Sequence, residues 1–227
     1  MPLPIPVHVA IVMDGNRRWA KKNNYPIFRG HRRGARRAAE IAAAALKHNI
    51  AYLSLFAFSS ENWKRSPVEI NYLMRLFSRS IEHHTARLIG QEICVRFIGD
   101  LTPLNADLFQ KIRSIQEKTQ HGRKLFLTIG INYGSRDEIG RALRKIPPEE
   151  IANCSWETVQ KHLDTQYSPD VDLFIRTSGE QRLSNFLLLQ SAYAELVFVQ
   201  KNWPEFTAQD FETILQEFGR RQRNFGK

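Results

Sequence analysis

Four polar clusters in the chain carry residue types that bind phosphate groups and metal ions. They are Asp14-Gly15-Asn16, Ser59-Ser60-Glu61-Asn62, Asn132-Tyr133-Gly134 and Arg176-Thr177-Ser178-Gly179. Each cluster follows an apolar segment of the kind expected for a buried strand. In a parallel sheet, ligands bind beyond the carboxyl ends of the strands. We therefore expect these clusters, which lie far apart in the sequence, to meet at one edge of a sheet and form a site.

Asp14 is the first candidate for chemistry, because a carboxylate at the end of an apolar strand would lie at the ligand edge. An aspartate there could instead form a turn that only closes the strand. Between Asp14 and Glu40 there is no acidic residue, whereas basic residues are frequent. These are Arg17, Arg18, Lys21, Lys22, Arg29, Arg32, Arg33, Arg36 and Arg37. This pattern suggests a metal-bound polyphosphate, with the aspartate on the metal and arginines on phosphate oxygens. Arg33, Arg36 and Arg37 are interpreted as a solvated helix face.

A second basic loop runs from Arg176 to Ser184 and contains two arginines and two serines. It could form a second phosphate site, although a polar surface loop would have the same composition. Glu195 stands among apolar neighbours, so it needs an arginine or a metal as its partner. Two basic loops, two separated carboxylates and an apolar, aromatic interior suggest two diphosphate substrates with apolar tails. These residues by themselves do not identify the reaction.

The composition narrows the class of protein further. A formal net charge of +10 over 227 residues favours nucleic acid, an anionic membrane surface or a phosphorylated substrate as partner. The sequence lacks the glycine-rich signatures of P-loop and Rossmann nucleotide sites. Its two cysteines, Cys94 and Cys154, are far apart, which favours the reducing cytoplasm over a disulfide framework. No apolar run is long enough to span a bilayer, and the proline-rich start does not predict a signal peptide.

Alternating strands and helices predict a single α/β domain over residues 1–227, with a mostly parallel central sheet flanked by helices. The apolar runs predict strands at residues 7–14, 51–58, 93–98, 124–131, 171–175 and 196–199. Helices are expected at residues 32–48, 66–89, 137–145, 155–164 and 208–221. A domain of this size can bury a substantial core.

Several motifs, in order from about residue 7 to the C-terminus, resemble those of cis-prenyltransferases and most closely those of undecaprenyl diphosphate synthases. They read MDGNRRWA at 13–20, GHRRG at 30–34, FSSENWKR at 58–65, FIGD at 97–100, NYG at 132–134, IRTSGEQRLSNF at 175–186 and WP at 203–204. The resemblance implies a transferase that condenses isopentenyl diphosphate units with an allylic diphosphate, usually farnesyl diphosphate, in cis geometry. It also implies undecaprenyl diphosphate as product for cell-wall lipid carrier synthesis, Mg²⁺ as cofactor, and a homodimer.

The same resemblance gives roles to individual residues. Asp14 becomes the central catalytic residue and a Mg²⁺ ligand, and Glu195 becomes the second metal carboxylate. The allylic diphosphate is surrounded by Gly15, Asn16, Arg17, Arg18, Trp19 and His31. The site is further lined by Ser59, Ser60, Glu61, Trp63 and Arg65. The isopentenyl diphosphate site comprises Arg176, Arg182, Leu183 and Ser184. Asn62 is the family's proton acceptor, but an amide is a poor base, so Asn62 could instead position isopentenyl diphosphate while released diphosphate takes the proton.

The growing apolar chain needs a dry, apolar tunnel, whose expected walls are the strand at 51–58 and the helix from 68. Most apolar residues there are equally explained as ordinary core. Ala57 lies one residue before Phe58, at a position where the family has small residues in longer-chain enzymes and bulkier residues in short-chain enzymes. Because residues 69–100 also contain no insertion, Ala57 predicts a product of medium length.

Three positions depart from the family pattern. Ile27 stands in place of an arginine, for which Arg29 could substitute. Gln181 replaces a frequent histidine near the metal. Asn224 replaces an arginine expected to reach the isopentenyl diphosphate of the partner subunit, a role that Arg223 could fill.

Two other functions compete with an enzyme. A nucleic-acid-binding protein would use the same basic residues but would leave Asp14, Asn62 and Glu195 unexplained, so no nucleic-acid partner is expected. A non-catalytic subunit that activates a partner should have lost the aspartate and arginines that this chain keeps. The expected partners are the two diphosphates, a second copy of the chain and, transiently, a membrane surface.

Overall fold

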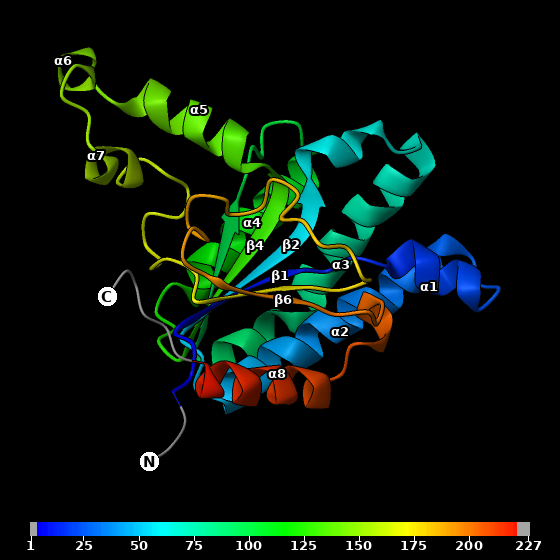
Figure 1. Ribbon diagram of the computed structural model, residues 1–227. Helices are drawn as coiled ribbons and strands as arrows, with labels where there is room; N and C mark the ends of the chain where they lie inside the picture. The colour runs from blue at the N-terminus through cyan, green and yellow to red at the C-terminus, as the bar shows by residue number, and fades with distance from the viewer. Residues whose placement is uncertain (1–3, 222–227) are drawn as a thin grey trace.

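The computed structural model describes residues 4–221 and shows one α/β domain built on a six-stranded sheet (Figure 1). The strands are β1 (His8–Val12), β2 (Tyr52–Ser59), β3 (Ile93–Ile98), β4 (Leu125–Tyr133), β5 (Leu173–Arg176) and β6 (Glu195–Phe198). Their order in the sheet is β3-β4-β2-β1-β5-β6, and every neighbouring pair is parallel. The predicted fold class is therefore confirmed.

Helices connect the strands and cover the sheet. They are α1 (Asn16–Lys22), α2 (Ile27–Lys47), α3 (Pro67–Gly90), α4 (Ala106–Thr119), α5 (Ser135–Lys145), α6 (Pro148–Ile151), α7 (Trp156–Gln160) and α8 (Ala208–Arg220), with short 3-10 helices η1 (Ser60–Lys64) and η2 (Trp203–Glu205). In Figure 1, α2 and α8 lie on one side of the sheet and α5 to α7 on the other. Within residues 4–221, no helix has the length and apolar character that crossing a membrane requires.

Residues along β1 alternate between two apolar cores. Val9 and Ile11 pack with residues of α2 and α8, among them Ile41. Ala10 and Val12 pack on the other face of the sheet. Burying one such side chain of the Val or Ile type contributes about 1.5–3 kcal/mol to folding. A strand buried on both faces appears in the sequence as a continuous apolar run, which is why the pattern locates β1.

The helices differ from the sequence prediction in several places. α2 begins at Ile27 rather than at residue 32, α7 ends at Gln160 rather than at 164, and α1, α4 and α6 are absent from the prediction. The short helices α1 and α6 contain too few residues to show a period. α4 does carry a signal, because Asn105 caps it by accepting a hydrogen bond from Leu108 N, and Leu108 and Ile112 are buried at helical spacing.

Arg33 and Arg37 are more than a solvated face of α2. Arg33 Nε and Arg37 Nη2 donate to the carbonyl oxygen of Pro204 at 3.2 and 3.5 Å, so they attach α2 to η2. Arg36 is exposed, as predicted. Arg33 is exposed as well, so the interpretation as a solvated helix face holds for Arg33 and Arg36, whereas Arg37 is half-buried.

Candidate functional site

The four polar clusters meet at the carboxyl edge of the sheet. Val12, the last residue of β1, pairs with Phe56 of β2 and with Arg176 of β5, while Ser59 pairs with Tyr133 of β4. The clusters around these positions therefore share one edge, as the sequence predicts. Residues of three of the clusters, all but Asn132-Tyr133-Gly134, line a polar cleft. Its lining includes Asp14, Gly15, Asn16, Arg17, Arg18, His31, Ser59, Ser60, Glu61, Asn62, Arg65, Arg176, Leu183 and Ser184.

Three of the predicted site residues lie outside this lining: Trp19, Trp63 and Arg182. Trp19 is buried, and the guanidinium of Arg33 lies 5.2 Å from its ring centroid. Trp63 Nε1 donates to Asn132 Oδ1 at 2.7 Å and so joins η1 to the end of β4. The side chain of Arg182 is 60% exposed next to the cleft. The two tryptophans thus support the walls, while the exposed Arg182 side chain lies at the edge of the cleft, where its guanidinium pairs with Glu180.

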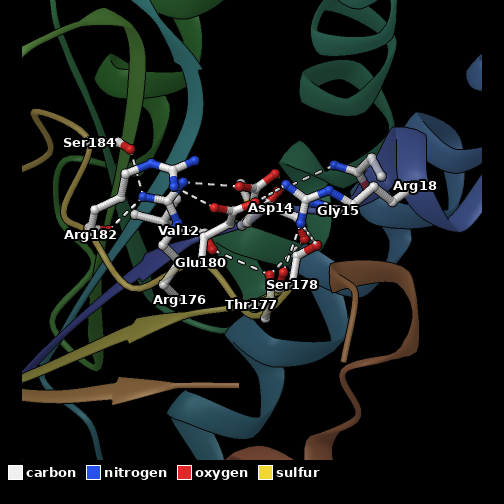
Figure 2. Close-up of polar contacts among 12 residues, drawn as sticks. Val12, Asp14, Gly15, Arg18, Arg176, Thr177, Ser178, Glu180, Arg182 and Ser184 are labelled. Atoms are coloured by element: carbon white, nitrogen blue, oxygen red, sulfur yellow. Dashed lines mark hydrogen bonds and ion pairs between the residues drawn. The ribbon is translucent and has the colours of Figure 1, made fainter. Parts of the chain in front are cut away.

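Asp14 and Arg176 form an ion pair in the cleft (Figure 2). Arg176 Nη2 lies 3.0 Å from Asp14 Oδ2, and Gly15 N donates to Asp14 Oδ1 at 2.7 Å. Arg176 is nearly fully buried, and its Nη1 also donates to the carbonyl oxygen of Arg182 and to Ser184 Oγ, at 2.5 and 2.6 Å. Arg176 therefore fixes the orientation of Asp14 and the position of the loop at 182–184 together.

Gly15 makes the turn between Asp14 and α1. Its φ is 100°, a backbone conformation that favours glycine. A Cβ at this position would lie 2.5 Å from Asn202 Oδ1 and 2.7 Å from Ser178 Oγ. A side chain would force this packed turn apart, so glycine is required for Asp14 and α1 to share the same edge of the cleft.

Glu180 connects the two basic loops, and it is not among the site residues predicted from the sequence. Its carboxylate forms ion pairs with Arg18 and with Arg182 (Figure 2). Arg18 Nη1 also donates to the carbonyl oxygen of Ser178 at 2.7 Å. A hydrogen bond from Arg182 and the nearby charge of Arg18 hold the pKa of Glu180 below its usual value. Glu180 is the one acidic residue in the basic loop at 176–184, and this position is the sequence signal that could have identified it as a partner of the arginines.

His31 belongs to a buried network that includes Glu69, a residue not predicted as part of the site. Its Nε2 lies 3.0 Å from Glu69 Oε1, and Arg65 Nη1 lies 3.3 Å from the same oxygen. Burial lowers the pKa of His31 more than the contact with Glu69 raises it. Burial thus favours the neutral form of His31, whose Nε2 lies within hydrogen-bond distance of Glu69. Glu69 could have been noticed in the sequence, because an acidic residue three positions after a serine is typical of a helix start. In the structure, Ser66 caps α3 by accepting a hydrogen bond from Glu69 N.

Asn62 lies in the turn that opens η1. Its Oδ1 accepts a hydrogen bond from Ser59 N at 3.3 Å, so the amide oxygen is engaged by the backbone. The other polar atom of the side chain, Nδ2, is a hydrogen-bond donor. It suits binding a phosphate oxygen better than accepting a proton.

An apolar cavity adjoins the polar cleft. Asn16, His31, Ala57 and Leu73 line both spaces, which places Ala57 at their junction. The cavity lies between α2, α3 and the sheet. Its walls include Ala35, Ala38, Ala39, Leu76, Phe77, Ile81, Leu55, Val95 and Leu127. A molecule with a charged head in the cleft could thus extend an apolar tail between the two helices.

Glu195 does not join Asp14 within one chain. It begins β6 opposite Leu173, which in turn pairs with Val9 near the start of β1, so Glu195 lies toward the amino edge of the sheet. Its Oε2 lies 2.7 Å from Arg221 Nη1. Among residues 4–221 no group of three or more His, Cys, Asp or Glu side chains could hold a metal. A metal at Asp14 would therefore need oxygens from a ligand, such as a diphosphate.

The three departures from the family pattern lie in different surroundings. Ile27 is the first residue of α2, and the guanidinium of Arg29 lies 3.6 Å from the centroid of the Tyr25 ring, so Arg29 already has an aromatic partner. Gln181 is exposed. The prediction for residues 223 and 224 falls outside the described part of the chain.

Comparison with known proteins gives matches along nearly the whole chain. The family model described as putative undecaprenyl diphosphate synthase matches residues 12–226. The isoprenyl transferase of Aquifex pyrophilus is 42% identical over 227 residues, covering 100% of this chain and 98% of that protein. The isoprenyl transferase of Agrobacterium fabrum is 45% identical over 228 residues, covering 98% of this chain and 92% of that protein.

Solved structures match over the same extent. The lavandulyl diphosphate synthase of Lavandula x intermedia, in complex with dimethylallyl diphosphate, superposes with a TM-score of 0.94 at 32% identity, covering 98% of this chain and 99% of that one. A probable undecaprenyl diphosphate synthase from Campylobacter jejuni gives a TM-score of 0.82 at 36% identity, covering 99% and 100%. The two structures are named for different products, so this likeness leaves the product undecided.

Proposed function

This chain belongs to the undecaprenyl diphosphate synthase family of cis-prenyltransferases, and on that premise we propose that it condenses isopentenyl diphosphate units with farnesyl diphosphate, in cis geometry, to make undecaprenyl diphosphate for cell-wall lipid carrier synthesis. The observation that supports this most is the place of the Asp14–Arg176 pair. It lies in a cleft bordered by two basic loops, and an apolar cavity opens from the same edge. This arrangement suits a substrate with a diphosphate head and an apolar tail.

The proposed reaction uses the two basic loops for the two diphosphates. The allylic diphosphate would contact Gly15, Asn16, Arg17, Arg18 and His31, and isopentenyl diphosphate would contact Arg176, Arg182, Leu183 and Ser184. As the allylic carbon–oxygen bond breaks, arginine N–H groups stabilise the negative charge that grows on the leaving diphosphate. The isopentenyl double bond then attacks the allylic carbon, in a site whose apolar walls exclude water. Asn62 would position the isopentenyl unit, and the proton would pass to released diphosphate.

Mg²⁺ is the proposed cofactor. Asp14 would hold it together with diphosphate oxygens, since Mg²⁺ is usually bound by one or two carboxylates plus substrate phosphates. When bound, it would offset charge on the leaving group. Glu195 lies toward the opposite edge of the sheet, so it could serve such a metal only from a second copy of the chain. A homodimer is therefore part of the proposal.

We also propose that the protein is cytoplasmic and meets an anionic membrane surface transiently. Arg32 and Arg36 of α2 and Arg75 and Arg79 of α3 are exposed, and none has an ion-pair partner among residues 4–221. These helices border the apolar cavity. Anionic head groups would complement the arginines, and an apolar product could pass to the bilayer from this side.

Purified protein with farnesyl diphosphate, radiolabelled isopentenyl diphosphate and Mg²⁺ tests the proposed function. We expect label to enter polyprenyl products, whose length is measured by thin-layer chromatography after dephosphorylation. Chelation of divalent metal should stop the transfer. Salt-dependent binding of DNA or RNA without prenyl transfer would instead support a nucleic-acid-binding protein.

Arg182→Ala should raise the KM for isopentenyl diphosphate far more than the KM for farnesyl diphosphate. A hydrogen bond to a charged group contributes about 1.5–3 kcal/mol, which corresponds to roughly a tenfold to hundredfold change. Steady-state kinetics with each substrate varied in turn measures both constants. Arg113→Ala, on the exposed face of α4, is the matched control and should change neither. Equal increases in both constants would show that the two diphosphate sites are wrongly divided.

Ala57→Leu should shorten the product while the first condensation continues. Ala57 lies where the cleft meets the apolar cavity, so a larger side chain would obstruct a lengthening tail. Forcing extra methylene groups into packed space costs about 1–3 kcal/mol, which favours release over extension by roughly fivefold to a hundredfold. Chromatography of the products measures this shift, with Ala86→Leu on the exposed face of α3 as control. An unchanged length distribution would remove Ala57 from the wall of the product path.

A further inference from the structure

The loop that follows Arg182 has an unusual backbone. Ser184, Asn185 and Leu187 have φ values of 48°, 62° and 47°, in the left-handed region that residues with side chains seldom occupy. A residue with a side chain stays in this strained conformation only where its surroundings hold it there, and asparagine tolerates the conformation best. The shape of this loop must therefore be set by contacts with other segments.

Asn185 supplies contacts to the start of α5. Its carbonyl oxygen accepts from Ser135 N at 2.8 Å, and its Oδ1 accepts from Arg136 N at 3.1 Å. The residue before α5 is Gly134, which has no side chain to cap the helix. Ser135 Oγ in return accepts from Leu188 N at 2.8 Å. Asn185 thus caps α5 from a distant part of the chain.

The other end of the same amide reaches across the cleft. Asn185 Nδ2 donates to Glu61 Oε1 at 3.2 Å, and Glu61 lies in η1, 124 residues earlier. Partial burial acts to raise the pKa of Glu61, but hydrogen bonds from its own backbone N–H and from Ser59, Asn185 and Ser60 hold that pKa below its usual value. One side chain therefore joins η1, the start of α5 and the loop at 182–188.

We propose that Asn185 is a positioning residue that holds the loop at 182–184 in the shape that binds isopentenyl diphosphate. The inference rests on the proposed function, because it concerns the site given there to that substrate. Ser184 precedes Asn185 directly and accepts a hydrogen bond from Arg176 at 2.6 Å. Movement of Asn185 would displace Ser184 and Arg182 from the buried guanidinium that orders them. The allylic site would be much less affected, because its residues lie on the β1–α1 segment and in the first turns of α2.

Three variants separate the contacts of Asn185. Asn185→Gly removes the side chain but suits the positive φ, so the backbone remains unstrained. Asn185→Asp keeps the cap on α5, where a negative charge is favourable, but sets a carboxylate against Glu61. In Asn185→Asp with Glu61→Gln, the new amide can donate to the aspartate and rebuild the bridge. A thermal melt of each variant reports whether the fold is kept.

We expect Asn185→Gly and Asn185→Asp to raise the KM for isopentenyl diphosphate about tenfold or more, with the KM for farnesyl diphosphate changed less than threefold. Asn185→Asp should melt close to the unaltered protein. The double variant should bind isopentenyl diphosphate better than the two single changes combined would allow. Unchanged constants, equal increases for both substrates, or absence of rescue would overturn the proposal.

Titration calorimetry with isopentenyl diphosphate keeps the two proposals distinguishable. If the unaltered protein transfers no prenyl group, the proposed reaction fails, yet weaker binding of isopentenyl diphosphate by Asn185→Asp and its recovery in the double variant would still support the role of Asn185. If transfer proceeds and Asn185→Asp binds normally, the inference about Asn185 alone is wrong.

Discussion

Asp14→Ala should lower kcat/KM about a thousandfold or more while the protein remains folded. Asp14 is the only carboxylate among the cleft residues at the end of β1, and one of its oxygens is oriented by Gly15 N and the other by Arg176. Removing the group proposed to hold Mg²⁺ against the leaving diphosphate would cost several kcal/mol in the transition state, of the order of 4 kcal/mol for a thousandfold loss. Single-turnover kinetics with farnesyl and isopentenyl diphosphates measures the effect.

Asp14→Asn is the matched control for the ion pair. The amide keeps the shape and can still accept from Arg176, so it should preserve stability better than alanine, which leaves a buried guanidinium without its anionic partner. Both variants should nevertheless lose activity, because neither carries a charged oxygen for a metal. Turnover near that of the unaltered protein in a folded variant would contradict the proposed role of Asp14.

The strands and the shared edge were predictable because both depend on local pattern. Val9–Val12 form a continuous apolar run, as a strand buried on both faces must. Parallel pairing then forces Asp14 and Arg176 to the same edge, although 162 residues separate them. Strand order itself was not needed for this conclusion, since every strand of a parallel sheet has its carboxyl end at the same side.

The partners of the site residues were not predictable, because they depend on side-chain contacts between distant segments. Nothing near Arg18 in the sequence indicates that it meets Glu180. Likewise, nothing in the sequence indicates that Glu69 of α3 is the partner of His31, because the two residues meet only in the folded chain. For Glu195 the sequence did indicate that a partner is needed, because its neighbours are apolar. In the structure Arg221 is such a partner. Whether it also serves a metal in a dimer stays a prediction.

Arg176→Ala should reduce kcat/KM about a hundredfold to a thousandfold and also lower stability. The guanidinium is the common partner of Asp14, the carbonyl oxygen of Arg182 and Ser184 Oγ. Removing one member of a buried ion pair costs about 3–5 kcal/mol. The Asp14 side chain is 31% exposed, so water would solvate it in part, and we expect a loss nearer about 2–3 kcal/mol in the free energy of unfolding. Urea denaturation measures that loss.

Arg176→Lys distinguishes the effect of the positive charge at position 176 from the effect of the hydrogen-bonding geometry of the guanidinium. A lysine would keep a cation near Asp14 but has a single ammonium in place of the planar fork that reaches three oxygens at once. Because the loop at 182–184 would lose its ordering contacts, the KM for isopentenyl diphosphate should stay raised even where stability is largely restored. If lysine instead restores that KM in full, charge alone explains the role of Arg176. The loop would then be held by other contacts, foremost those of Asn185 with α5 and Glu61.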